Sequence, residues 1–183
     1  VVVGDQRELA RVRGADGVVV QQYLGDPAGE FTAGCFVDRE GAVRGTIAMR
    51  RTLTSGTTMS ARIGQDPEVS EVSAAVCAAL RPRGPCNVQL RLHDGVPTPF
   101  ELNVRFSGTT PMRTHFGFDE VGAALRHLVL GQPAVDLPRV TAGLALRYWN
   151  ELYPDAAAVA ALERDGVLEP GSVPRPAIED WGL

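Results

Sequence analysis

The stretch that most constrains this fold is Phe100-Glu101-Leu102-Asn103-Val104-Arg105-Phe106. Side chains alternate between the two faces of a β-strand, so a strand here puts its three polar residues on one face and its apolar residues on the other. The apolar face, Leu102, Val104 and Phe106, is expected to join the core. The polar face combines a carboxylate, an amide and a guanidinium, a set that an ordinary solvated sheet surface also carries.

A second alternating stretch, Asn87 to Leu92, precedes it and predicts a hairpin around Asp94-Gly95. The separation of Gln89 and Glu101 is even, so the two face each other only across a loop with an odd number of residues. A three-residue loop, Asp94-Gly95-Val96, meets this condition. The more usual two-residue Asp-Gly turn would place Gln89 opposite Phe100 and split the polar residues between faces. We expect the three-residue loop.

In that register Gln89, Glu101 and Asn103 present oxygen atoms on neighbouring strands. Such oxygens suit Mg²⁺, a hard ion that takes a few protein oxygens together with substrate phosphates. Arg105 would face the same phosphates. A metal ion and a guanidinium are what phosphoryl transfer requires, because catalysis there consists mainly of positioning and of neutralising charge on oxygens.

The rest of the chain predicts strands in hairpins with helices packed on them, which is an α+β fold with a mostly antiparallel sheet. Four further strands are expected, at 17–24, 30–37, 42–53 and 144–149, and residues 54–58 are expected to form a mobile loop. Three helices are expected, at 66–80, 119–130 and 155–164. The inward faces expected for the first two helices are Val69, Val72, Val76 and Leu80, and Val121, Leu125, Leu128 and Val129.

Composition excludes several classes of protein. The chain has 183 residues, 44% of them hydrophobic, which suits one domain with a real core. A net charge of -4 without a basic run argues against nucleic acid as a partner. No apolar stretch approaches the roughly 20 residues that span a bilayer, so no membrane partner is expected and the protein is predicted to be cytoplasmic. The three cysteines are interpreted as small buried hydrophobes.

Three segments carry a resemblance to a known family. Phe100 to Gly108 resembles the E-x-N-x-R segment of ATP-grasp ligases and the small-residue turn after it. Val18 to Leu24 resembles the strand and hinge that hold adenine, and Gly29-Glu30-Phe31-Thr32 resembles the G-x-E-x-x stretch that follows. Gln89 resembles the glutamine found at this position in the carbamoyl-phosphate-synthase-like branch of the family. Within the class, amino-acid or peptide ligation is the favoured activity.

The resemblance implies a function for each part of the site. ATP is the expected cofactor, with backbone groups of the hinge at the adenine and Glu30 near the ribose. Mg²⁺ is the second expected cofactor, and Arg105 would act on the transferred phosphate or an acylphosphate. The residues so assigned are Gln21, Gln22, Tyr23, Leu24 and Glu30 for ATP, Gln89, Glu101 and Asn103 for metal, and Arg105 for catalysis.

The resemblance implies an ADP-forming ligase that joins a small-molecule carboxylate to an amine through an acylphosphate. Two alternatives stay open at this point. One is a non-catalytic nucleotide-binding module that keeps the ATP-grasp fold for regulation. The other is an interaction domain whose polar strand face is merely solvated.

The chain contains no lysine. ATP-grasp domains bring two lysines and a glycine-rich phosphate loop from the segment that precedes this one. Residues 1–134 are therefore predicted to be the C-terminal part of an ATP-grasp domain that lacks this N-terminal part. Residues 135–183 are predicted to be an extension packed on it or following it, and the fragment is expected to be inactive alone.

Overall fold

A computed structural model describes residues 2–25, 29–64, 66–149 and 154–167. The chain divides into two compact units, Val1–Leu146 and Arg147–Leu183. The second unit contains helix α5 (Ala156–Asp165), whose N-cap Asp155 accepts a hydrogen bond from the Ala158 N–H at 2.7 Å. This helix was expected from the sequence. The domain boundary at residue 134 stays a prediction.

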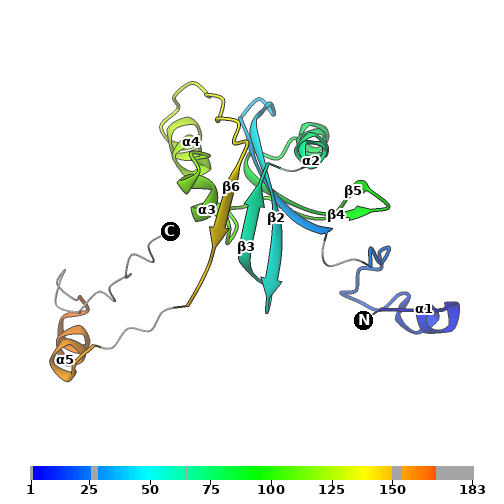
Figure 1. Ribbon diagram of the computed structural model, residues 1–183, viewed down its shortest axis with the longest axis horizontal. Coiled ribbons are helices and arrows are strands. Elements are labelled where there is room, and N and C mark those ends of the chain that lie inside the picture. Colours follow the sequence, from blue (N-terminus) through cyan, green and yellow to red (C-terminus); the bar gives the residue numbers. More distant parts are fainter. Residues whose placement is uncertain (1, 26–28, 65, 150–153, 168–183) are drawn as a thin grey trace. The chain divides into compact units, whose positions relative to one another are not determined.

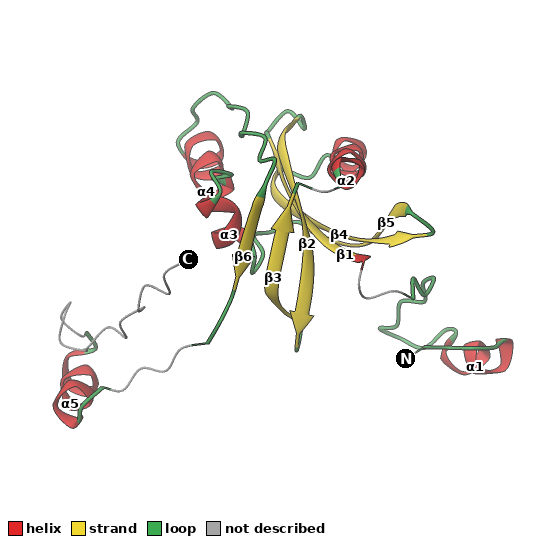
Figure 2. Cartoon of the chain, in the orientation of Figure 1, coloured by secondary structure: helices red, strands yellow, loops and turns green. Residues whose placement is uncertain are grey.

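The first unit is built on a six-stranded antiparallel sheet in the order β5-β4-β1-β2-β3-β6 (Figures 1 and 2). Helices lie on both of its faces, so the predicted α+β fold with a mostly antiparallel sheet is confirmed. The strands are β1 (Glu30–Val37), β2 (Val43–Thr54), β3 (Thr57–Ile63), β4 (Gly84–His93), β5 (Val96–Asn103) and β6 (Gly143–Leu146).

Helix α2 covers one face of the sheet, and α3 with α4 covers part of the other (Figure 1). Every residue of the central strand β1 is buried, because apolar or polar groups pack on both of its faces. Under α2 the core contains Phe31, Val88 and all three cysteines, which are free and buried as predicted. The helices of the first unit are α1 (Gln6–Val12), α2 (Pro67–Leu80), α3 (Thr110–His115), α4 (Glu120–Ala124) and the π-helical η2 (Leu125–Val129).

The inward faces predicted for two helices are partly wrong. Helix α2 begins at Pro67 as expected, but it buries Val69, Ser73 and Cys77, while Leu80 is exposed. Small side chains on this stripe let the helix lie close to the sheet, and the Ser73 hydroxyl is satisfied by the Val69 carbonyl at 2.7 Å.

In the second helical segment, α4 and η2, the buried face differs from the face that the apolar residues predicted. Leu125 and Val129 are exposed, whereas Glu120 and His127 are buried. Two causes act together. An ion pair draws the Glu120 carboxylate inward, and the change to π-helical bonding from Leu125 onward alters which residues share a face.

Residues 54–58 form a tight turn rather than the predicted mobile loop. Ser55 and Gly56 both have positive φ, 49° and 77°, as a two-residue hairpin turn requires. This turn joins β2 to β3, a strand not foreseen from its polar sequence, and hydroxyls of Thr52 and Ser60 pair across the two strands at 2.7 Å.

The buried strand predicted at residues 17–24 is also absent. Residues 18–25 have no regular secondary structure, and Val18, Val19 and Val20 are exposed. A strand needs a hydrogen-bonding neighbour, and the described part of the chain supplies none to this run. The last strand is shorter than expected and ends at Leu146.

Candidate functional site

The hairpin of β4 and β5 reaches the expected pairing by a different route. Its turn contains two residues, Asp94 and Gly95, so the predicted three-residue loop is wrong. Gln89 nevertheless pairs with Glu101, because the register shifts between Gln89 and Leu90 and leaves Phe100 as an extra residue in β5. One inserted residue restores the face that a two-residue turn would have reversed.

The three residues assigned to metal are in mutual contact. The side-chain amide of Gln89 donates to Glu101 Oε1 at 2.7 Å, and that of Asn103 donates to the same oxygen at 2.7 Å. Gln89 is half-buried and Glu101 is exposed, so the cluster opens to solvent along β5. No hydrogen bond between described residues engages the second carboxylate oxygen of Glu101.

Arg105 lies just beyond the strand, because β5 ends at Asn103. Its guanidinium donates to the Phe106 carbonyl at 2.9 Å and is 3.5 Å from Asn103 Oδ1. Val104 and Phe106 are exposed, which corrects the prediction that both would enter the core. The alternation that would bury them stops where the strand stops, whereas Leu102 still packs against the core.

The cluster extends across the sheet to Glu30, the first residue of β1. The buried Glu30 carboxylate pairs with Arg51 at 2.6 Å and with Arg91 at 2.8 Å. Arg51 also donates to Gln89 Oε1 at 2.6 Å, which joins the two groups. The open network is the name used below for these six residues: Glu30, Arg51, Gln89, Arg91, Glu101 and Asn103.

Arg51 and Arg91 were not assigned to a site from the sequence. One of Arg50 and Arg51 had to share a face with Glu30, and pairing of Phe31 with Arg50 decides that it is Arg51. Arg50 instead stacks over the Phe31 ring on the other face, at 5.5 Å from its centroid. The signal was present in the alternation, but it needed the register of β1 and β2.

The charge state of Glu30 follows from its surroundings. Burial acts to raise the pKa of this carboxyl, but hydrogen bonds and charges from Arg91 and Arg51 outweigh it and hold the pKa below the ordinary value of 4.5. Glu30 is therefore ionised at neutral pH. Within the open network, the two guanidinium groups of Arg51 and Arg91 are matched by the two carboxylates of Glu30 and Glu101.

The predicted adenine hinge lies next to the end of β4. Gln21, Gln22 and Tyr23 are exposed and Leu24 is buried. The Gln22 side chain contacts His93 Nε2 at 3.2 Å. The hinge is thus tied to the same strand that carries Gln89 and Arg91.

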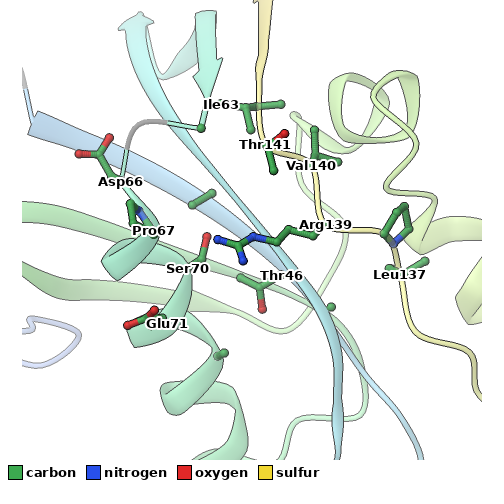
Figure 3. Close-up of a pocket in the computed structure, with 15 residues that line it drawn as sticks. Thr46, Ile63, Asp66, Pro67, Ser70, Glu71, Leu137, Arg139, Val140 and Thr141 are labelled. Atoms are coloured by element: carbon green, nitrogen blue, oxygen red, sulfur yellow. The ribbon is translucent and has the colours of Figure 1, made fainter.

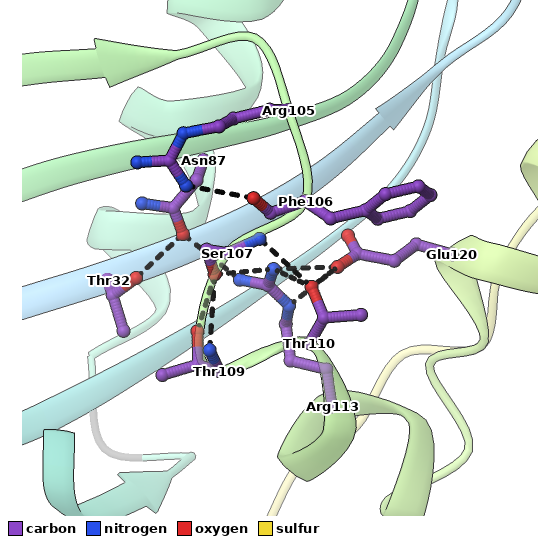
Figure 4. Close-up of polar contacts among 9 residues, drawn as sticks. All are labelled: Thr32, Asn87, Arg105, Phe106, Ser107, Thr109, Thr110, Arg113 and Glu120. Carbon is purple, nitrogen blue, oxygen red and sulfur yellow. Dashed lines mark hydrogen bonds and ion pairs between the residues drawn. The ribbon is translucent and has the colours of Figure 1, made fainter. Parts of the chain in front are cut away.

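A second polar cluster, not foreseen from the sequence, lies on the same face of the sheet, because its Thr32 pairs with Gln89 across β1 and β4. Figure 4 shows this second cluster. Arg113 of α3 pairs with Glu120 of α4 at 2.6 Å, and both side chains are almost fully buried, at 1% and 0% exposed. Neither residue follows an apolar period that would have predicted burial. The closed network is the name used below for these residues: Thr32, Asn87, Ser107, Thr110, Arg113 and Glu120.

A cavity of about 450 Å³ lies on the opposite face of the sheet (Figure 3). It is bordered by α2, by Thr46 and Ala48 of β2, and by residues 137–141. Thr46 pairs with Cys35 on the α2 side, so the cavity is separated from the open network by the sheet. The open network is the better candidate site, because hydrogen bonds and ion pairs join its six polar residues and it contains the residues assigned to metal from the sequence.

The donor set sets a limit on metal binding. Within the described ranges, no group of three or more His, Cys, Asp or Glu side chains is arranged to hold a metal ion. The candidate set of Gln89, Glu101 and Asn103 contains one carboxylate and two amides. A hard ion would find one charged ligand there and need substrate oxygens to complete its shell.

The profile of the family described as "ATP-grasp in the biosynthetic pathway with Ter operon" matches residues 15–152. The chain belongs to this ATP-grasp family. No curated protein sequence matches the chain significantly. The match includes the hinge, the open network and Arg105.

Solved ATP-grasp structures share this fold. The chain is similar to N5-carboxyaminoimidazole synthetase from Staphylococcus aureus, with a TM-score of 0.57 at 8% identity over 76% of this chain and 38% of that one. It is also similar to N5-carboxyaminoimidazole ribonucleotide synthetase from Thermus thermophilus, with a TM-score of 0.54 at 13% identity over 87% and 46%. The enzyme from Aspergillus clavatus, in complex with ADP and 5-aminoimidazole ribonucleotide, gives a TM-score of 0.54 at 13% identity over 74% and 39%. The chain thus spans less than half the length of these structures.

Among the described helices, none combines the length and the apolar character needed to cross a bilayer.

Proposed function

We propose that this chain supplies the metal and phosphate side of the active site of an ATP-dependent, ADP-forming ligase that joins a carboxylate to an amine. The observation that carries the proposal is the contact of Gln89, Glu101 and Asn103 on two adjacent strands, with Arg105 directly after them. Membership of an ATP-grasp family supports the assignment. A cytoplasmic location is part of the same proposal.

The oxygens of Glu101 and Asn103 fit Mg²⁺ better than that of Gln89. Glu101 has a carboxylate oxygen without a partner among the described residues, whereas the Gln89 oxygen accepts from Arg51 at 2.6 Å. Gln89 then acts mainly by orienting Glu101. Bound Mg²⁺ supplies charge neutralisation for the phosphates of ATP.

Arg105 is proposed as the catalytic residue because its guanidinium is exposed beside Asn103 and has only weak or backbone partners. A guanidinium can leave such contacts to bind the oxygens of the transferred phosphate, where negative charge develops. The same group would stabilise an acylphosphate formed from the carboxylate substrate.

The nucleotide is proposed to lie along the open network towards the hinge. Gln21, Gln22, Tyr23 and Leu24 are proposed to meet the adenine, mainly through backbone groups. Arg51 and Arg91 are proposed to bind phosphate oxygens through their guanidinium groups next to Glu30. The structure of the Aspergillus clavatus protein, which has a similar fold, contains ADP, and this supports the proposal that the present chain binds a nucleotide.

The active enzyme is proposed to need more than these residues. The chain has no lysine, and the resemblance implies that lysines and a glycine-rich loop close over the phosphates from another part of the protein. The fragment is therefore proposed to be inactive alone. Residues 135–183 are proposed as the extension that follows this part.

A second candidate is a nucleotide-binding module without turnover. One observation favours it: the metal set carries a single carboxylate, which lowers the affinity for Mg²⁺. The two functions differ in outcome. The module would bind ATP without releasing ADP with any carboxylate and amine.

The test uses the full-length protein with ATP, Mg²⁺ and a panel of amino acids, and it measures release of ADP and phosphate. Replacing Arg105 by alanine is expected to lower kcat by about 100- to 1,000-fold, the usual effect of losing a group that stabilises transition-state charge. Arg62→Ala is the matched control, because Arg62 is an exposed arginine on the other face of the same sheet. Equal turnover of wild type and Arg105→Ala would remove Arg105 from catalysis, and ATP binding without turnover would favour the module.

A further inference from the structure

Arg113 of α3 is a buried cation that contacts its own helix and three other parts of the chain. Its guanidinium donates to Asn87 Oδ1 on β4 at 3.1 Å, to Ser107 Oγ at 3.0 Å, to Thr110 Oγ1 on α3 at 3.0 Å, and to Glu120 on α4 at 2.6 Å (Figure 4). Arginine alone among side chains offers five N–H donors in a fixed plane. The sheet, the segment after β5 and two helices therefore meet at one rigid group.

Glu120 fixes the guanidinium from the helix side. Its Oε1 accepts from both Nε and Nη2 of Arg113 and from the Thr110 hydroxyl at 2.6 Å. Its Oε2 is buried without a partner in the described part of the chain. All hydrogen bonds of this carboxylate among the described residues thus end on Oε1. They orient the Arg113 guanidinium, while Oε2 accepts no hydrogen bond from any residue that the structure describes.

The sheet makes room for this group at Gly34. A Cβ at that position would lie 2.6 Å from the guanidinium carbon and from Nε of Arg113. Real Cβ atoms do not approach so closely. The guanidinium is therefore seated against the backbone of β1, and its position is set by the sheet itself.

Residues 104–109 contact this group through Ser107. They follow the last residue of β5 and pair with no strand in the described part of the chain. Ser107 is their main anchor: its hydroxyl accepts from Arg113, and its N–H donates to Thr110 Oγ1 at 3.2 Å. Arg105 is two residues before this anchor.

We infer that Arg113, held by Glu120, is a positioning residue that sets the segment 104–109 and thereby aims Arg105 at the phosphate. Asn87 extends the effect to the metal side, because it pairs with Asn103 across β4 and β5. The consequence for catalysis rests on the function proposed above for Arg105. The role of Arg113 in ordering the segment 104–109 is independent of that proposal.

A purely stabilising role would not require this arrangement. Buried ion pairs are weak contributors to stability, and apolar residues of similar size often replace them without loss. What an apolar pair cannot replace is directional contact with Ser107 and Asn87 at once. Loss of the planar group should therefore disturb the segment more than it disturbs the rest of the fold.

The first test is amide hydrogen exchange by mass spectrometry on the full-length protein. Arg113→Lys keeps the charge but loses the planar fork, and exchange of residues 104–110 is expected to rise by about tenfold or more. Arg44→Lys is the matched control, because Arg44 pairs at 2.6 Å with the buried Asp38 at the other end of β1. Exchange of residues 104–110 unchanged in Arg113→Lys, or raised equally in Arg44→Lys, would overturn the inference.

A second variant keeps the test valid if Arg113→Lys does not fold. Ser107→Ala removes the anchor of the segment and leaves the Arg113–Glu120 pair in place. It is expected to raise exchange of the same residues by a smaller factor, with exchange in β1 unchanged. No rise in this variant would overturn the role of Ser107 as the anchor.

Turnover provides the arm that depends on the proposed function. In Arg113→Lys, kcat for ADP release is expected to fall by about 10- to 100-fold while KM for ATP stays within about twofold, because misplacing a catalytic group affects the transition state most. Unchanged kcat together with raised exchange would separate the segment from catalysis. Absence of turnover in wild type would defeat the proposed function, and the exchange data would still decide the positioning role.

Discussion

The open and closed networks stand on the same face of the same two strands, yet they differ in how far solvent reaches them. Glu30 and Gln89 belong to the open network, while Thr32 and Asn87, two residues along each strand, belong to the closed one. Each network pairs arginine with a glutamate at 2.6 Å. The difference is cover: α3 and α4 seal Arg113 at 1% exposed, whereas the side chains of Arg51 and Arg91 remain 10% and 23% exposed.

The comparison shows that residue type does not decide what an ion pair does. A sealed pair loses its water, so removing one partner leaves an uncompensated charge. A pair with access to solvent can exchange its partner for a ligand at little cost. Where the helices end on the sheet therefore separates a sealed network from one that solvent reaches.

The largest expected effect breaks the closed network. Replacing Arg113 by methionine should lower the free energy of unfolding by about 3–5 kcal/mol, because Glu120 is left buried and unpaired. The double variant Arg113→Met/Glu120→Leu should recover most of this loss. Urea unfolding monitored by circular dichroism measures both values.

Arg105→Met is the corresponding change at the solvent-exposed side. It should alter the free energy of unfolding by about 1 kcal/mol or less, since this guanidinium is exposed. Losses of equal size for Arg105→Met and Arg113→Met would contradict the expectation that burial, and not residue type, sets the cost of losing a guanidinium.

An effect smaller than that of Arg113→Met is expected where the sheet meets Arg113. Gly34→Ala should cost about 1–3 kcal/mol, because the new methyl group would overlap the guanidinium. Gly108→Ala is the control, since a Cβ there meets no atom within 4 Å, and it should change stability by about 0.5 kcal/mol or less. Thermal unfolding of the two variants side by side would show a shift confined to Gly34→Ala, and a tolerated alanine would mean that Arg113 moves freely.

The smallest effect concerns acid and the open network. Because the pKa of Glu30 is lowered on folding, its contribution to stability is present above the ordinary value of 4.5 and is lost as pH falls through the lowered folded pKa. Glu30→Gln should remove this part of the pH dependence. Urea midpoints measured from pH 6 to pH 3 test it, and an equally steep decline in the variant would assign the acid sensitivity to other carboxyls.

The sequence predicted the facing of Gln89 and Glu101 correctly but explained it wrongly. For the two residues to face each other, an odd number of unpaired residues must lie between them. The insertion lies at Phe100 in β5, between Pro99 and Glu101, and not in the turn. Parity is visible in a sequence, whereas the position of a bulge depends on how the edge strand bends against its neighbour.

Arg51, Arg113 and Glu120 could not be assigned in the same way. Arg51 required the register of β1 and β2, which links residues far apart in the chain. Arg113 and Glu120 lie in short helices, α3 and α4, whose burial reverses the usual preference of charged residues for the surface. The predictions that Leu80 and Leu125 face inward were wrong for a related reason. The helix faces that contact the sheet carry small or charged side chains in place of the most apolar ones.

By itself the sequence determined the antiparallel hairpins, the α+β class, the burial of the cysteines and the polar motif at Glu101, Asn103 and Arg105, because alternation and turn residues act over short distances. Only the tertiary structure decided that β5 ends before Arg105, that a bulge corrects the register of β4 and β5, and that Arg113 contacts the segment 104–109. These features depend on contacts between distant segments, where packing and the loss of water determine which groups pair.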